Sequence, residues 1–181
     1  MKQIVKHNII LIGFMGSGKT SVGVHLAERL SYQFKDTDQM IEQKVLSSIN
    51  QIFSIHGEEY FRDFETDLLK SLVTKLENTV LSTGGGMPIR EQNKILLKDL
   101  GYVVFLKTSK QTILNRLRGD SARPLLQGDE LEHKVEKMLA LRTPIYEKVA
   151  HKIITTDGRS ITELSELIME SYLKQIYRRQ A

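Results

Sequence analysis

The stretch that decides the fold is GFMGSGKT, residues 13–20. It follows the apolar run IILI and overlaps the start of KTSVGVHLAERL. The latter segment places Val22, Leu26 and Leu30 on one face of a helix. An apolar strand, a glycine loop ending in Lys-Thr and a helix, in this order, are typical of a phosphate-binding loop. The sequence therefore predicts a nucleotide site at this point of the chain.

Each part of this loop has a chemical reason. The backbone amides of Gly16, Ser17, Gly18 and Lys19 can point into one concave site, and the helix that follows adds its positive end. The Lys19 ammonium would neutralise the outer phosphates, and Thr20 would place its hydroxyl on Mg²⁺. The loop alone does not distinguish a molecular switch, a motor and a small-molecule kinase.

Short apolar runs alternate with helical patterns along the rest of the chain. The expected strands are residues 8–13, 33–36, 79–83, 102–107 and 151–156. Such alternation predicts an α/β fold with a five-stranded parallel sheet flanked by helices, and ligands at the carboxyl ends of the strands. The length of 181 residues suits a single domain, residues 1–181.

Three helix starts are predicted from a Ser or Thr followed three residues later by Gln or Glu, the spacing of a capping box. These pairs are Ser48 with Gln51, Thr108 with Gln111, and Ser160 with Glu163.

Composition restricts the function further. The chain has no cysteine, which excludes disulfides, thiolate metal sites and a cysteine nucleophile. No apolar stretch approaches the roughly 20 residues of a membrane helix, and no signal-peptide cleavage site precedes the glycine loop. The net charge of +4 comes from basic residues interspersed with acidic ones, so a nucleic-acid partner is not expected. A cytoplasmic protein is expected.

Two acids close the second expected strand. Of Asp36 and Asp38, in KDTDQM, one could hold the water shell of Mg²⁺ while the other accepts a proton from a hydroxyl. The alternative for Asp38 is a simple helix-start carboxylate. The glycines Gly84, Gly85 and Gly86 follow the third strand and indicate close approach of a ligand or backbone, or else a tight loop.

Several arginines carry little information individually. Arg62 and Glu65, three apart on an expected helix, are by default a surface ion pair. Pro144 lies inside a helical pattern and is expected to break or kink it, which would leave Arg142 at a distorted helix end, able to grip a carboxylate.

The segment LRGDSARPLLQGDELE contains glycine and charge, and is interpreted either as a mobile closing segment or as a solvated loop. In the first case Arg116, Arg118 and Arg123 would bring positive charge to phosphates and exclude water.

Taken together, the motifs GFMGSGKT, DTD, FRDFE, GGG, RPLL and LRTPIY resemble the shikimate kinase family over roughly residues 8 to 160. The resemblance implies transfer of the γ-phosphoryl group of ATP, with Mg²⁺, to the 3-hydroxyl of shikimate, on the path to chorismate and the aromatic amino acids. It also implies a P-loop kinase fold like that of the nucleoside monophosphate kinases, with a lid at about residues 118–130, and a monomer.

The resemblance implies roles for individual residues. Gly13 to Thr20 would bind the ATP phosphates, and Thr20 and Asp36 would hold the metal. Asp38 would activate the attacking hydroxyl. Arg62 and Arg142 would grip the shikimate carboxylate, and Gly84, Gly85 and Gly86 would form a wall of the substrate pocket. Arg123 would reach the transferring phosphate from the lid. Arg116 and Arg159 would contact the adenine.

Two alternatives stay open at this stage. One is a related kinase for gluconate or a nucleoside monophosphate, which FRDFE together with GGG disfavours. The other is a non-catalytic nucleotide-binding module, against which Lys19, Asp38 and Arg123 argue together.

Overall fold

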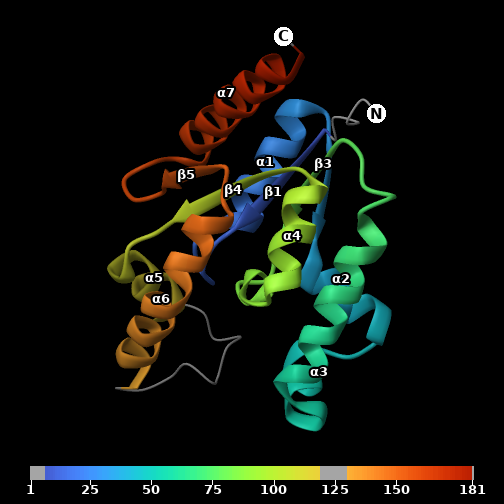
Figure 1. Cartoon of the computed structure of the whole chain (residues 1–181). Coiled ribbons are helices and arrows are strands. Elements are labelled where there is room, and N and C mark those ends of the chain that lie inside the picture. Colours follow the sequence, from blue (N-terminus) through green and yellow to red (C-terminus); the bar gives the residue numbers. More distant parts are fainter. Residues whose placement is uncertain (1–6, 119–129, 181) are drawn as a thin grey trace.

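The computed structural model describes residues 7–118 and 130–180. Its strands are β1 (Asn8–Ile12), β2 (Gln33–Asp36), β3 (Thr79–Ser82), β4 (Tyr102–Lys107) and β5 (Lys152–Thr155). Its helices are α1 (Lys19–Leu30), α2 (Thr37–Val45), α3 (Ile49–Leu72), the short 3₁₀ helix η1 (Met87–Ile89), α4 (Glu91–Leu100), α5 (Lys110–Arg118), α6 (Glu130–Val149) and α7 (Ile161–Gln180). The predicted strands are confirmed to within a residue at each end (Figure 1).

The five strands form one parallel sheet in the order β2-β3-β1-β4-β5. This order places the loop after β1 beside the loop after β3, and the loop after β3 beside the end of β2. Because the strands are parallel, these three segments meet at one edge of the sheet. The topology therefore brings the glycine loop, the GGG segment and the two acids together.

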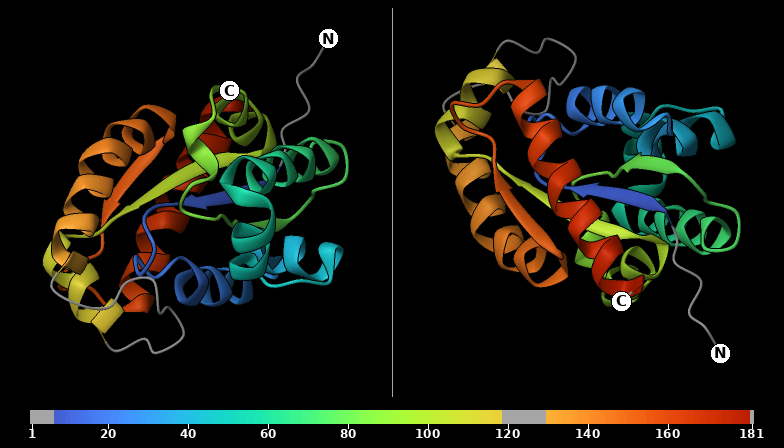
Figure 2. Two further views of the ribbon diagram at one scale, coloured as in Figure 1. Left: turned by 90° about the horizontal axis from the view of Figure 1, so that it is seen from below. Right: turned by 90° about the horizontal axis from the view of Figure 1, so that it is seen from above.

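Helices cover both faces of the sheet (Figure 2). Side chains alternate along β1, so Ile10 and Ile12 join a core with α3, α4, α5 and α6. Ile9 and Leu11 point to the other face, where α1 and α7 complete a second core. Burial on both faces explains why the central strands are continuously apolar. In the described part of the chain, no helix combines the length and the hydropathy needed to cross a bilayer.

Helix α3 is interrupted at Gly57. This residue has φ 83° and ψ 173°, and two helical segments meet there. The Ser48 capping box is confirmed, since Ser48 and Gln51 each bond the other's backbone amide. So is the box at Ser160 and Glu163.

The predicted cap at Thr108 is wrong. Helix α5 is capped by Ser109, whose hydroxyl accepts a hydrogen bond from Thr112 N at 3.3 Å. The Thr108 hydroxyl instead shares a 2.7 Å hydrogen bond with Thr156, at the end of the neighbouring strand β5. A tertiary partner has therefore displaced the local one.

Candidate active site

The glycine loop joins β1 to α1 and closes on itself. Gly16 and Gly18 have φ of 75° and 89°, a region that side chains disfavour, so glycine is needed at both positions. Ser17 N donates to Phe14 O at 3.2 Å, which tightens the turn. No side chain caps the start of α1 among the residues described, so its first amides are directed into the loop. The loop can thus bind an anion through its backbone.

The Lys19 side chain lies inside this loop. Its Nζ donates to Gly13 O and Phe14 O, both at 2.9 Å, and the residue is buried. The positive charge is therefore held at the loop by the loop's own carbonyl groups, next to the place where phosphates would bind.

The two acids have different positions. Asp36 caps α2, because its Oδ1 accepts from Asp38 N at 3.0 Å, and its Oδ2 accepts from the Thr20 hydroxyl at 3.4 Å. Asp36 and Thr20 thus pair a carboxylate with a hydroxyl oxygen at the mouth of the loop, a donor set that suits Mg²⁺. Across residues 7–118 and 130–180, no cluster of three or more His, Asp or Glu side chains could hold a metal ion alone. A Mg²⁺ here would take its remaining ligands from water and phosphate.

Two glycines after β3 each make room for a polar side chain. A Cβ on Gly84 would lie 2.5 Å from Asp38 Oδ1 and 3.0 Å from Glu65 Oε1. A Cβ on Gly86 would overlap the guanidinium of Arg62. The backbone therefore touches the two carboxyl groups at one position and the arginine two residues later.

The glycine between them touches both halves of the site. A Cβ on Gly85 would lie 3.4 Å from Gly13 O and 3.5 Å from Met15 N of the phosphate loop. It would also lie 3.8 Å from Arg142 Nη1. Gly85 is thus close to both the phosphate loop and an arginine of α6.

The pair Arg62 and Glu65 is buried, so the expectation of a surface ion pair is wrong. Arg62 Nη1 donates to Glu65 Oε2 at 2.6 Å, while its Nη2 donates to the exposed Glu58 at 2.7 Å. The second oxygen of Glu65, Oε1, has no hydrogen-bond partner among the described residues. Burial raises the pKa of Glu65 to about 7 although Arg62 opposes the rise, and the carboxylate of Asp38 favours it.

Arg142 does not lie at a helix end, which corrects the prediction from Pro144. Helix α6 runs through both residues to Val149. A proline removes only one backbone donor, and α6 is fixed to the core before and after it by buried Val135 and Tyr146. The Arg142 guanidinium lies 5.8 Å from the centroid of the Phe14 ring, beside the glycine loop.

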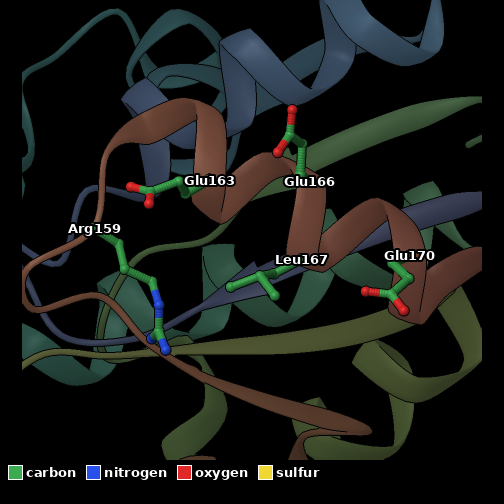
Figure 3. A pocket seen from close by; sticks show the side chains of 5 residues that line it. All are labelled: Arg159, Glu163, Glu166, Leu167 and Glu170. Atoms are coloured by element: carbon green, nitrogen blue, oxygen red, sulfur yellow. The ribbon is translucent and has the colours of Figure 1, made fainter.

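The remaining predicted residues lie in three places. Arg116 Nη1 donates to Gly16 O of the phosphate loop at 2.7 Å. Arg159 donates to Thr155 O and lines a surface pocket of about 470 Å³ whose other lining residues are Glu163, Glu166, Leu167 and Glu170 (Figure 3). Arg123 and nearly all of the predicted lid, residues 118–130, fall outside the described residues.

Sequence reasoning missed three residues that the fold brings here. Glu65 was noticed only as a spacing partner, and Glu58 and Tyr146 were not considered. Tyr146 donates to Gly85 O at 2.5 Å. Its place one turn after Arg142 was the available signal, because residues four apart share a helix face.

The site combines a phosphate loop and its lysine with a hydroxyl–carboxylate pair that suits a metal. A neighbouring pocket carries carboxylates and arginines. These features define a P-loop phosphotransferase of small molecules. The family model described as shikimate kinase matches residues 15–176. A shikimate kinase of Thermodesulfovibrio yellowstonii is 42% identical over 165 residues, which cover 91% of this chain and 94% of the relative. The chain belongs to the shikimate kinase family.

Solved structures agree with this assignment. The structure titled shikimate kinase from Acinetobacter baumannii in complex with shikimate is 40% identical, with a TM-score of 0.87, and covers 96% of each chain. A shikimate kinase from Aquifex aeolicus is 34% identical, with a TM-score of 0.77, covering 94% of this chain and 98% of the other. A gluconokinase from Sinorhizobium meliloti, 14% identical with a TM-score of 0.61 over 98% of this chain and 99% of its own, shares the fold alone.

Proposed function

We propose that this chain transfers the γ-phosphoryl group of ATP to the 3-hydroxyl of shikimate, giving shikimate 3-phosphate and ADP. Family membership supports the reaction. One observation supports its location: Gly84, Gly85 and Gly86 bring an aspartate, the phosphate loop and two arginines into contact with one short backbone segment. Donor and acceptor can therefore meet there.

On the donor side, the amides of residues 13–20 bind the phosphates. Lys19 leaves its loop carbonyls to contact the phosphoryl group in transfer, where its charge is worth most. Thr20 and Asp36 would hold Mg²⁺, which supplies charge neutralisation at the phosphates when it is bound. Arg116 would cover the nucleotide, and its hydrogen bond to Gly16 O of the phosphate loop supports this role.

On the acceptor side, Arg62 and Arg142 hold the shikimate carboxylate, and Asp38 receives the proton of the 3-hydroxyl as its oxygen attacks phosphorus. The bond from the γ-phosphorus to the bridging oxygen breaks, and ADP leaves with its electron pair. The protein supplies position and charge and forms no covalent intermediate.

We propose further that residues 1–181 form one kinase domain. Arg123 and the lid, the adenine contact of Arg159, the monomer and the cytoplasmic location remain predictions from the sequence.

The reaction is tested by coupled release of ADP with shikimate present, shikimate omitted, and gluconate or a nucleoside monophosphate in its place. Turnover should require shikimate. ADP release that ignores shikimate would support a nucleotide-binding module instead, and turnover with gluconate would support a related kinase.

The carboxylate grip is tested by a cycle. Arg62→Ala and Arg142→Ala should each lower kcat/KM for shikimate by about one to two decades, since a charge-assisted hydrogen bond is worth about 1.5–3 kcal/mol. With a neutral analogue that lacks the carboxylate, the loss should largely vanish. An equal loss on both compounds would mean that the arginines support the structure and do not bind the acid.

A further inference from the structure

Tyr146 is the largest fully buried side chain next to the acceptor pocket. It lies in α6 one turn after Arg142, and its ring packs against Phe105 of β4 with centroids 5.1 Å apart. In this apolar surrounding its hydroxyl group donates a hydrogen bond to Gly85 O at 2.5 Å. A buried phenol with its partner in the glycine segment thus connects α6 to the segment that separates the two halves of the site.

The same hydroxyl also interacts with Arg142. Burial raises the pKa of Tyr146 to about 12, and the positive charge of the nearby Arg142 guanidinium, with its hydrogen-bonding to the phenol, works against this rise. The phenol therefore keeps its proton throughout the neutral range and is a permanent donor to Gly85 O. Its oxygen can accept from Arg142 at the same time, so one atom fixes a loop carbonyl and a guanidinium.

The position of Gly85 gives this contact its importance. A Cβ on Gly85 would lie within 3.8 Å of Gly13, Met15 and Arg142, so this residue is close to both the phosphate loop and Arg142. A small rotation of this peptide would change the position of Arg142 relative to the phosphate loop. Small displacements of an acceptor reduce transfer steeply, because phosphoryl transfer depends mainly on positioning.

We propose that Tyr146 is a positioning residue for the acceptor: its hydroxyl fixes the Gly85 peptide and the Arg142 guanidinium in the geometry that receives the substrate carboxylate. This inference rests on the proposed function, which assigns that carboxylate to Arg142. Tyr146 acts through these two groups and does not touch the reacting atoms.

The test is Tyr146→Phe, which removes one oxygen and keeps the ring in its apolar surrounding. KM for shikimate should rise about tenfold, as expected for the loss of one buried hydrogen bond, with kcat reduced as well. KM for ATP should change less than twofold, since the phosphate loop keeps its own hydrogen bonds. Circular dichroism fixes an assay temperature at which every variant is folded.

The matched control is Tyr172→Phe. Tyr172, in α7, is also buried, and its hydroxyl is hydrogen-bonded to that of Tyr32 at 3.2 Å, but it belongs to the core on the other face of the sheet. The control removes the same atom from a similar environment and should leave both KM values unchanged.

A cycle with Arg142→Ala completes the test. If Tyr146 acts through Arg142, Tyr146→Phe costs much less in the Arg142→Ala background than in the wild type. Three outcomes overturn the proposal: unchanged kinetics, a rise in both KM values equal to that of the control, or full additivity with Arg142→Ala. Wild-type turnover that does not depend on shikimate would overturn the proposed function itself. The same assay detects this outcome in the wild type, independently of the variants.

Discussion

Arg62 Nη1 lies 2.6 Å from Oε2 of Glu65, and the two side chains are 10% and 0% exposed. An i,i+3 pair on a helix is usually solvated and contributes little. This pair is enclosed because Gly86 packs against the guanidinium and Gly84 against the carboxyl group. The properties of the pair are therefore those of a buried site and not of a surface.

The first prediction concerns pH. The pKa of Glu65 is raised from 4.5 to about 7, so the folded protein binds this proton more tightly than the unfolded chain does. The tighter proton binding stabilises the folded state. This stabilisation is fully present below the ordinary pKa of 4.5 and is lost as the pH rises from there through about 7. It amounts to about 3 kcal/mol.

The measurement is urea unfolding of the wild type and of Glu65→Gln at several pH values between about 4.5 and 8, a range that includes both the ordinary and the raised pKa of Glu65. The amide of Gln keeps an oxygen for Arg62 and does not titrate. The difference in unfolding free energy should change in favour of the variant as pH rises. Parallel curves would show that Glu65 titrates normally.

The second prediction concerns Gly86. Its φ of −87° suits any residue, so Gly86→Ala adds a clash with Arg62 and no backbone strain. Overpacking of about 1–3 kcal/mol should raise KM for shikimate roughly 5- to 150-fold. Gly23→Ala is the control, because its Cβ would meet the Phe34 ring of the other core. The control should lower the melting temperature and leave KM for shikimate unchanged. If Gly86→Ala has a normal KM for shikimate, Arg62 does not belong to the acceptor pocket.

The third prediction concerns Glu58, whose exposed carboxylate accepts from Nη2 of Arg62, the group that we propose binds the substrate carboxylate. Its side chain is 60% exposed, whereas that of Glu65 is fully enclosed, so Glu58 is the exchangeable partner. Glu58→Gln should lower KM for shikimate about two- to fivefold, the strength of an exposed pair. Glu59→Gln, which removes the same charge from Arg90, should not. An increase in KM with Glu58→Gln would mean that this carboxylate assists binding.

The fourth prediction concerns Asp38. Asp38→Asn keeps the shape and removes the proton acceptor, so kcat should fall by about 10² to 10⁴. KM for ATP should change little, because it is Asp36, and not Asp38, that accepts the hydrogen bond from the Thr20 hydroxyl. Collapse of ATP binding with a surviving rate at saturation would mean that the two aspartates have exchanged roles.

The fifth prediction concerns Lys19. Lys19→Met should abolish most of the transfer rate, because it removes the charge that acts on the phosphoryl group. It should also lower the free energy of unfolding by about 1–3 kcal/mol, since Gly13 O and Phe14 O each lose a charged donor. Chemical denaturation and turnover measure the two effects separately. Near-normal turnover would contradict the assignment.

Local chemistry explains what the sequence predicted well. The glycine loop and the strands on either side of it depend on neighbours in the chain, and so do the capping boxes at Ser48 and Ser160. The parallel direction of the strands then follows from alternation of strands and helices, and it puts the strand ends that carry Asp36 and Gly84 at one edge of the sheet.

Tertiary contacts explain the features that the sequence predicted badly. Thr108 bonds Thr156 from another strand, so its local capping partner is unused. Arg62 and Glu65 are buried by glycines about twenty residues away in the sequence. Pro144 is tolerated because the core holds α6 on both sides of it. In each case the deciding partner is far away in sequence, where spacing rules do not reach.

The Gly84–Gly86 segment also has a consequence for resistance to inhibitors. Enzymes commonly escape a bound drug by exchanging a side chain in its contact surface. At this segment a methyl group on Gly84 or Gly86 would strike the enzyme's own Asp38 or Arg62. A compound that takes most of its affinity from this segment would therefore leave the enzyme few escape mutations that do not damage its own substrate binding.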